Sequence, residues 1–221
     1  APKFIHVSNK KITKKDKPLV IIGKGVTFDT GGLNIKPGNS MRNMKKDMGG
    51  AAIAISLFLV SSYLLKKTKI VLLIPLAENA VSSNSMRPGD IYNSFSGKKV
   101  EISHTDAEGR LLLADAIALA NELNPSLIID FATLTGAARV ALGEDIPAYY
   151  CNNEKLAKKI DILNNKKLRC WRLPLYEDYK KKLYSDVADL CNASLDGMAG
   201  SITAALFIQE FLNTPKLPWI H

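Results

Sequence analysis

The chain has 221 residues but only three cysteines and three histidines. An odd number of cysteines, with no short metal-type spacing and no secretion signal, indicates reduced thiols in a reducing compartment. No HExxH pattern relates the histidines, which argues against a histidine-based zinc site. The sequence therefore predicts neither a disulfide-stabilised protein nor one with a common zinc motif.

The N-terminus lacks the apolar core of a signal peptide, because its first residues read APKFIHVSNKKITKKDK. The longest apolar run, AAIAISLFLVSSYLL at 51–65, is too short to span a bilayer comfortably and predicts a buried helix. Internal repeats and low-complexity linkers are also missing. We therefore expect a cytoplasmic protein with no membrane partner.

Several widespread catalytic motifs are absent as well. The segment GKGVTFDTGG is rich in glycine but lacks the GK[ST] ending of a phosphate-binding loop, and no GxGxxG opens a helix. No GxSxG elbow is present, which argues against a serine hydrolase.

Positive charge is in excess, with 30 Lys and Arg against 21 Asp and Glu and a net charge of +9. Such an excess favours acidic partners or nucleic acid through long-range attraction, but it does not define a fold. Much of it lies in short lysine clusters without interleaved aromatic residues, which is typical of a solvated surface. Nucleic-acid binding is therefore an alternative function and not the favoured one.

Apolar segments alternate between the lengths of strands and of helices. The segment 17–29 is predicted to begin as a short apolar strand and to run into a glycine-containing loop. Further strands are predicted in 68–79, 98–103 and 126–136, and helices in 51–65, 110–123 and 200–212. Continuous apolar strands that alternate with helices predict an α/β fold, with a mixed, mostly parallel central sheet and helices on both faces. We divide the chain into a basic lead segment, 1–18, and one main domain, 19–221.

Charged residues follow the predicted strands. Lys24 and Asp29 come after the first strand, the segment 106–110 follows the third, and 133–136 ends the fourth. Ligands of such folds bind at the carboxyl ends of the strands. This shared location is the first indication of a functional site.

Four carboxylates, in FDTGG, KKDMGG and TDAEG, would meet at this edge: Asp29, Asp47, Asp106 and Glu108. They would repel one another unless cations lay between them, and two divalent metals that share bridging carboxylates form a familiar hydrolytic site. Taken alone, Asp47 fits a helix N-cap better than a metal ligand, and the same interpretation covers the other acids that precede a helix. Capping does not explain why acids, glycine pairs and lysines recur together at several strand ends.

Basic residues accompany the acids. A lysine near acids usually forms a surface ion pair of little value. Beside two metals, Lys24 or Lys36 could instead lose its proton and bind metal, or stay charged and stabilise an oxyanion. The spacing does not assign these roles. Arg110 could hold an anion such as carbonate or a substrate carboxylate.

Three segments in this order, GKGVTFDTGGLNIKP, MKKDMGGAA and TDAEGRLLLADA, resemble the leucine aminopeptidase (cytosol aminopeptidase) family of dinuclear metallopeptidases. The later segments DFATLTGAARVALG and AGSITAALF are similar to the same family. The similarity extends from about Leu19 to the last residue.

The resemblance implies a metal-dependent aminopeptidase that hydrolyses the N-terminal peptide bond of peptides through a metal-bridging hydroxide. Two divalent ions (Mn, Zn or Mg) would bind, with Asp29 and Glu108 bridging them; the implied ligands are Lys24, Asp29, Asp47, Asp106 and Glu108. Lys36 resembles the catalytic lysine, and Arg110 resembles the arginine that holds a bicarbonate as proton shuttle. The implied substrate-binding residues are Lys36, Thr133, Leu134, Thr135 and Gly136.

The sequence also departs from the family pattern. Members usually carry a separate N-terminal domain and continue beyond the equivalent of LPWIH, so this sequence resembles most of a catalytic domain cut at both ends. His104 stands where asparagine is common. The family's hexamers imply a homo-oligomer, and an inactive metal-binding fragment is a further alternative.

Overall fold

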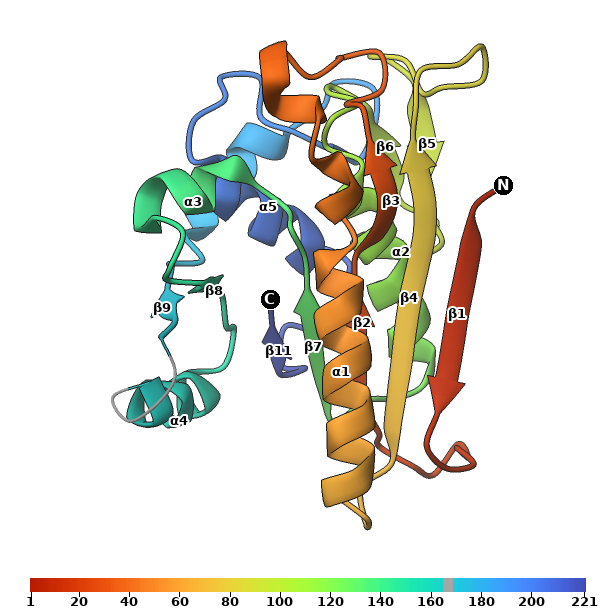
Figure 1. Cartoon of the computed structure of the whole chain (residues 1–221), viewed down its shortest axis with the longest axis vertical. Coiled ribbons are helices and arrows are strands. Elements are labelled where there is room, and N and C mark those ends of the chain that lie inside the picture. The colour runs from red at the N-terminus through yellow and green to blue at the C-terminus, as the bar shows by residue number, and fades with distance from the viewer. Residues whose placement is uncertain (165–168) are drawn as a thin grey trace.

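The computed structural model describes residues 1–164 and 169–221. A six-stranded sheet forms its centre, in the order β1-β4-β2-β7-β11, with β3 also paired to β4 (Figure 1). These strands are β1 (Lys3–Ser8), β2 (Leu19–Gly23), β3 (Gly25–Asp29), β4 (Ile70–Asn79), β7 (Leu127–Phe131) and β11 (Trp219–Ile220). Among the strand pairs described in this central sheet, only β1 with β4 is antiparallel. The predicted mixed, mostly parallel sheet is confirmed.

Helices cover both faces of this sheet, as predicted. The helix α1 (Gly49–Leu64) lies on one face, whereas α2 (Gly109–Glu122) and α5 (Gly200–Gln209) lie on the other (Figure 1). Successive residues of a strand point to opposite faces. Val20 and Ile22 of β2 accordingly join the core beneath α2 and α5, and Ile21 joins the core beneath α1. The continuous apolar strands are thus explained by burial on both sides.

The helix α1 differs from the prediction, because it is not buried all round. Its inner face is buried through Ala51, Ala54 and Phe58, but on its outer face Leu59 is 61% exposed and Tyr63 is 72% exposed. Together with the preceding turn it forms a 21-residue stretch, Met44–Leu64, that is long and apolar enough to cross a membrane by length and composition. Its inner face nevertheless packs along β2, β4 and β7.

Two further segments differ from what the sequence predicted. Residues 99–101, part of a predicted strand, form β6 (Lys99–Glu101) in a separate sheet with β5 (Ile91–Asn93) and β10 (Leu190–Cys191). Only the central residue of β6, Val100, is buried, so this strand lacks the two-sided burial of the central ones. The lead segment 1–18 contributes the edge strand β1, whose six residues are all exposed.

The remaining elements lie around the sheet. A small unit built from β8, α4 and β9 stands to one side of it (Figure 1). The bounds of the remaining elements are η1 (Gly38–Met41), η2 (Met44–Lys46), α3 (Gly136–Leu142), β8 (Ala148–Tyr149), α4 (Glu154–Asn164), β9 (Trp171–Arg172) and η3 (Glu177–Leu183).

Candidate metal centre

The predicted site residues meet at the carboxyl edge of the central sheet. Lys24 follows β2, Asp29 ends β3, and Asp47 and Glu108 precede α1 and α2. Carboxylate oxygens of Asp29, Asp47 and Glu108 lie within 4.8 Å of one another, and all three residues are buried. Segments far apart in the sequence therefore form one cluster, as expected.

Lys24 is the counter-ion at the centre of this cluster. Its Nζ lies 2.8 Å from Asp47 Oδ2 and 3.0 Å from Glu108 Oε1, and its side chain is 3% exposed. Burial alone would lower the pKa of Lys24, but the charges of Glu108 and Asp47 outweigh it and raise this pKa above its ordinary value. Burial raises the pKa of Glu108, although the ammonium group of Lys24 opposes it.

Lys36 joins the other two acids. Its Nζ lies 2.8 Å from Asp29 Oδ2 and 2.5 Å from Asp106 Oδ1. Burial works against ionisation of Asp29, but hydrogen bonds from Lys36, Gly31 and Asn79 prevail and lower its pKa. Burial and the charge of Asp29 raise the pKa of Asp106 despite its bond to Lys36. Asp106 is therefore linked to the cluster through Lys36.

The oxygens of this site match what a divalent cation requires. Several buried oxygens within residues 1–164 and 169–221 have no partner in hydrogen-bond geometry, and three of them belong to this site: Asp47 Oδ2, Asp106 Oδ1 and Glu108 Oε1. Each of the three lies at ion-pair distance from a lysine. Among the described residues, these oxygens are therefore paired only with lysine ammonium groups. Clustered carboxylate oxygens are the donors that hard divalent ions prefer.

Glycine allows one of the closest approaches in the site. A Cβ on Gly109 would lie 2.3 Å from Cε and 2.6 Å from Nζ of Lys24. Only glycine leaves room for the lysine to cross the first turn of α2 and reach Asp47. The glycine of the TDAEGR motif thus allows the observed position of Lys24.

Arg110 lies in the first turn of α2 and is 7% exposed. Its Nη1 donates to the backbone oxygen of Asn192 at 2.7 Å, whereas its Nε has no partner in the described part of the chain. Burial lowers the pKa of Arg110 to about 10, against the opposing charge of Glu108, so the group stays positive at neutral pH. A buried cation with a free donor is suited to hold a small anion.

The predicted substrate-binding residues lie between β7 and α3, beside the cluster. Thr133 Oγ1 donates to Asp47 Oδ1 at 2.7 Å, and the Thr133 backbone oxygen lies 3.5 Å from Lys24 Nζ. Leu134 packs against the core beneath α2, and Thr135 and Gly136 begin α3. Thr133 and Gly136 are exposed, so this edge is accessible to a ligand.

His104 is exposed two residues before Asp106. Its Nδ1 accepts a hydrogen bond from the backbone N–H of Asp106 at 3.2 Å. Its backbone oxygen accepts one from Asn192 Nδ2 at 2.8 Å. The ring therefore supports the loop that carries Asp106.

Uncharged residues that the sequence did not single out as site residues also support the site. Thr105 Oγ1 donates to the Gly31 oxygen at 2.6 Å and accepts from the Asn34 N–H at 2.8 Å, which ties two acid-bearing loops together. Asn192, fully buried, binds the backbone of residues 103, 104 and 107. Asn79 contacts two of the acids. These residues lie close to the charged motifs in sequence or in space, but a single Asn or Thr has no distinctive pattern that a sequence could reveal.

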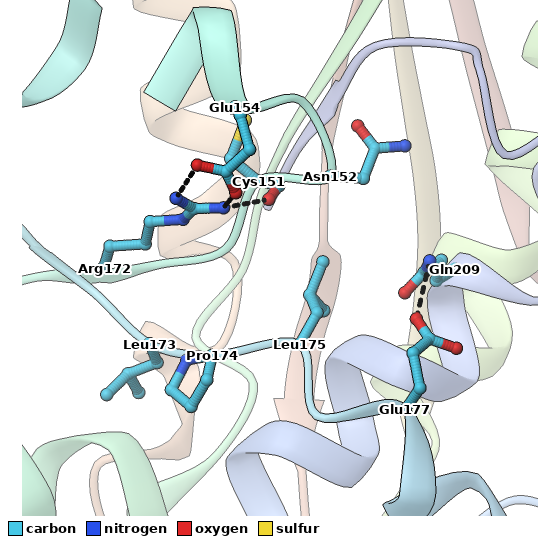
Figure 2. A pocket seen from close by; sticks show the side chains of 9 residues that line it. All are labelled: Cys151, Asn152, Glu154, Arg172, Leu173, Pro174, Leu175, Glu177 and Gln209. Carbon is cyan, nitrogen blue, oxygen red and sulfur yellow. Dashed lines mark hydrogen bonds and ion pairs between the residues drawn. The ribbon is translucent and has the colours of Figure 1, made fainter. Parts of the chain in front are cut away.

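A cavity of about 520 Å³ lies elsewhere, between the β8–β9 unit and α5 (Figure 2). The guanidinium of Arg172 pairs with Glu154, and Gln209 donates to Glu177 at 3.3 Å. None of the predicted site residues lines it. Its charged groups are satisfied by one another, so the cluster at the sheet edge is the better candidate.

Fold and site together define an α/β protein with a carboxylate- and lysine-lined centre at the carboxyl edge of its sheet, a type of centre that binds divalent cations. The model of the cytosol aminopeptidase family, catalytic domain, matches residues 1–221. The chain therefore belongs to this peptidase family, and the resemblance found in the sequence is confirmed.

Individual relatives agree with this assignment. The chain is 46% identical to a probable cytosol aminopeptidase of Chlamydia abortus and 44% identical to one of Methylobacillus flagellatus, over all of this chain and 44% of each relative. The crystal structure of the cytosol aminopeptidase of Coxiella burnetii matches with a TM-score of 0.93 and 48% identity, over 100% of this chain and 48% of that one. The chain thus spans less than half the length of these relatives.

Proposed function

We propose that this protein is a metal-dependent aminopeptidase that hydrolyses the N-terminal peptide bond of peptides, with two divalent ions (Mn, Zn or Mg). The observation that carries the proposal is the buried cluster of Asp29, Asp47 and Glu108, whose oxygens lie within 4.8 Å of one another. Lys24 and Asp106 would complete the ligand set, and Asp29 and Glu108 would hold both ions. When bound, such ions lower the pKa of a water molecule and polarise the scissile carbonyl.

The charge balance of the site supports binding of cations and of a free amino terminus. The four carboxylates face only two lysines, which leaves an excess of two negative charges among these six side chains. In a buried setting such an excess is costly unless cations offset it. A bound cation would in turn offer a place for the unprotonated amino group of a peptide, which would favour hydrolysis at the N-terminus.

Lys36 and Arg110 supply the remaining chemistry. The ammonium group of Lys36 stays charged, because its carboxylate partners outweigh burial and raise its pKa, and it stabilises negative charge that develops on the carbonyl oxygen. Arg110, whose Nε has no partner within the described residues, would hold a bicarbonate, and that anion would supply proton transfer between water and the leaving amine.

The residues Thr133, Leu134, Thr135 and Gly136 form the substrate-binding edge. Thr133 supports this role, because it is exposed and hydrogen-bonded to Asp47. A peptide that lies along this edge would place its first carbonyl beside the carboxylate cluster. The protein acts in the cytoplasm as a homo-oligomer, a hexamer in the manner of its family.

A peptidase assay on the metal-loaded chain tests the proposal. The chain should release the first residue of an unblocked leucine peptide, leave the N-acetylated peptide intact, and lose activity to a chelator. Asp106→Asn and Glu108→Gln should lower kcat/KM by more than the roughly 100-fold lost with an outer partner of a metal ligand. Asp186→Asn, at an exposed position, is the matched control. Full activity of both site variants would contradict the proposal.

The inactive-fragment alternative predicts metal uptake without turnover, so calorimetric titration beside the same assay separates it from an active enzyme. Nucleic-acid binding, motivated by the net charge of +9, predicts retention in a gel-shift experiment that weakens steeply with salt. The absence of retention at low salt would remove that alternative.

A further inference from the structure

Asn79 ends the longest strand of the sheet, β4, and is paired with Asp29 of β3. Asn79 is only 9% exposed. Its backbone oxygen accepts hydrogen bonds from the N–H and the hydroxyl of Thr30, at 2.8 Å and 2.9 Å. The side chain of Asn79 therefore projects from a backbone that is held to the end of β3 and to Thr30.

The amide of Asn79 is surrounded by acceptors. Its Nδ2 lies 2.8 Å from Asp29 Oδ1, 3.1 Å from the backbone oxygen of Thr105 and 3.3 Å from Glu108 Oε2. All three neighbours can only accept while the carboxyl groups are ionised. The NH2 group, and not the amide oxygen, must therefore face them.

Asn79 and the lysines share the two carboxylates between them. Asn79 takes Oδ1 of Asp29 and Oε2 of Glu108, whereas Lys36 faces Oδ2 of Asp29 and Lys24 faces Oε1 of Glu108. One neutral donor thus fixes one oxygen of each acid. It adds no positive charge that would oppose the binding of a cation.

We propose that Asn79 is a positioning residue of the metal centre, which orients Asp29 and Glu108 relative to each other so that both can bind the same pair of cations. This role rests on the proposed function, because it requires that the carboxylates bind metal. Outer partners of metal ligands set the direction of the ligand oxygens, and their loss weakens metal binding by roughly 10–100-fold.

The test compares Asn79→Leu, which keeps the shape but removes the donor, with the smaller Asn79→Ala. Asn84→Leu, in an exposed turn just beyond β4, is the matched control. Each purified chain is stripped with a chelator, checked for folding by its melting curve, and titrated with Mn²⁺ and Zn²⁺ against a chelating dye. The visible spectrum of the Co²⁺ form reports the ligand geometry, which a merely structural role of Asn79 would leave unchanged.

We expect both Asn79 variants to bind metal roughly 10–100-fold more weakly and to show an altered Co²⁺ spectrum, while Asn84→Leu matches the unsubstituted chain. Either Asn79 variant that folds and keeps the original affinity and spectrum overturns the positioning role alone. Failure of the unsubstituted chain to take up any of these ions would instead overturn the proposed function, and this role with it.

Discussion

The Nζ of Lys24 lies 2.8 Å from Oδ2 of Asp47, and both side chains are almost completely buried. The two residues are brought together from the end of β2 and the turn before α1, across the carboxyl edge of the sheet. Such a pair is costly to desolvate and adds little to stability by itself. Its position among further carboxylates points to a role in binding cations.

Metal binding should release protons. Because its carboxylate neighbours raise the pKa of Lys24 above the ordinary value, this side chain is protonated at neutral pH and must lose a proton before its nitrogen can bind metal. The raised pKa of Glu108 acts in the same direction, since a protonated carboxyl group also competes with the ion. Metal affinity should therefore fall as the pH is lowered.

Calorimetric titration with Mn²⁺ in two buffers of different ionisation enthalpy measures this release. We expect at least about one proton per protein at pH 7, as the ligation of a protonated lysine requires. Heats that do not depend on the buffer would show that Lys24 keeps its proton and is not a ligand.

Gly109→Ala should displace Lys24. The new Cβ would lie 2.3 Å from Cε of the lysine, which is far inside contact distance. The lysine side chain can turn away, so we expect the fold to persist and metal affinity to fall by roughly 10-fold or more. Dye competition measures the affinity, and circular dichroism checks the fold.

Gly200→Ala is the control for this substitution, because both glycines are the first residues of helices. A Cβ on Gly200 meets only the Cβ of Ala137, at an ordinary 3.7 Å. Equal metal affinity in the two variants would refute the packing argument for Gly109.

Arg110→Met should separate stability from activity. A cation whose pKa is lowered in the folded state destabilises that state at every pH below its folded value of about 10, and the cost disappears only as the pH rises towards its ordinary value. At neutral pH the full cost is present. Replacing the buried charge should thus raise the free energy of unfolding of the metal-stripped chain by about 0–1 kcal/mol relative to the unsubstituted chain, as measured with urea. Peptidase activity should be lost.

The same variant tests the anion site. Bicarbonate that binds to Arg110 stabilises the folded chain by linkage, so it should raise the melting temperature relative to chloride at equal ionic strength. Arg110→Met should abolish this rise. An equal rise in both proteins would place the anion elsewhere.

Thr105→Val should loosen the connection between the two loops that carry Asp29 and Asp106. The buried hydroxyl serves the backbone oxygen of Gly31 and the N–H of Asn34, and both would lose their partner. We expect a loss of about 1–3 kcal/mol in the free energy of unfolding, measured with urea. The control Thr27→Val removes an exposed hydroxyl with one long bond of 3.4 Å and should change little. Equal losses in the two variants would count against this explanation.

Much of the fold could be predicted, because its signals are local and strong. The apolar runs of β2 and β4 and the helices α1, α2 and α5 have lengths and patterns that few other structures accommodate. The placement of β6 could not be predicted, since a three-residue strand with one buried side chain does not specify its neighbours. The exposure of α1 also escaped prediction, because an apolar outer face gives no sign of which side packs on the sheet.

The candidate site shows the same division. Acids, lysines and glycine pairs at successive strand ends indicated where the charged groups would meet, and the structure brings Asp29, Asp47 and Glu108 together. Asn79 and Asn192 escaped notice, because a buried amide acts through contacts that only the tertiary structure creates. Asn192 matches a glycosylation sequon in the sequence, yet it is fully buried and bound to the loop before α2.

The most direct measurement is anomalous scattering from crystals soaked in Mn²⁺ or Zn²⁺. The account predicts two peaks, roughly 3.5–4 Å apart, between the carboxylates of Asp29, Asp47 and Glu108. A well-ordered, peptidase-active crystal with no peak among these side chains would contradict it.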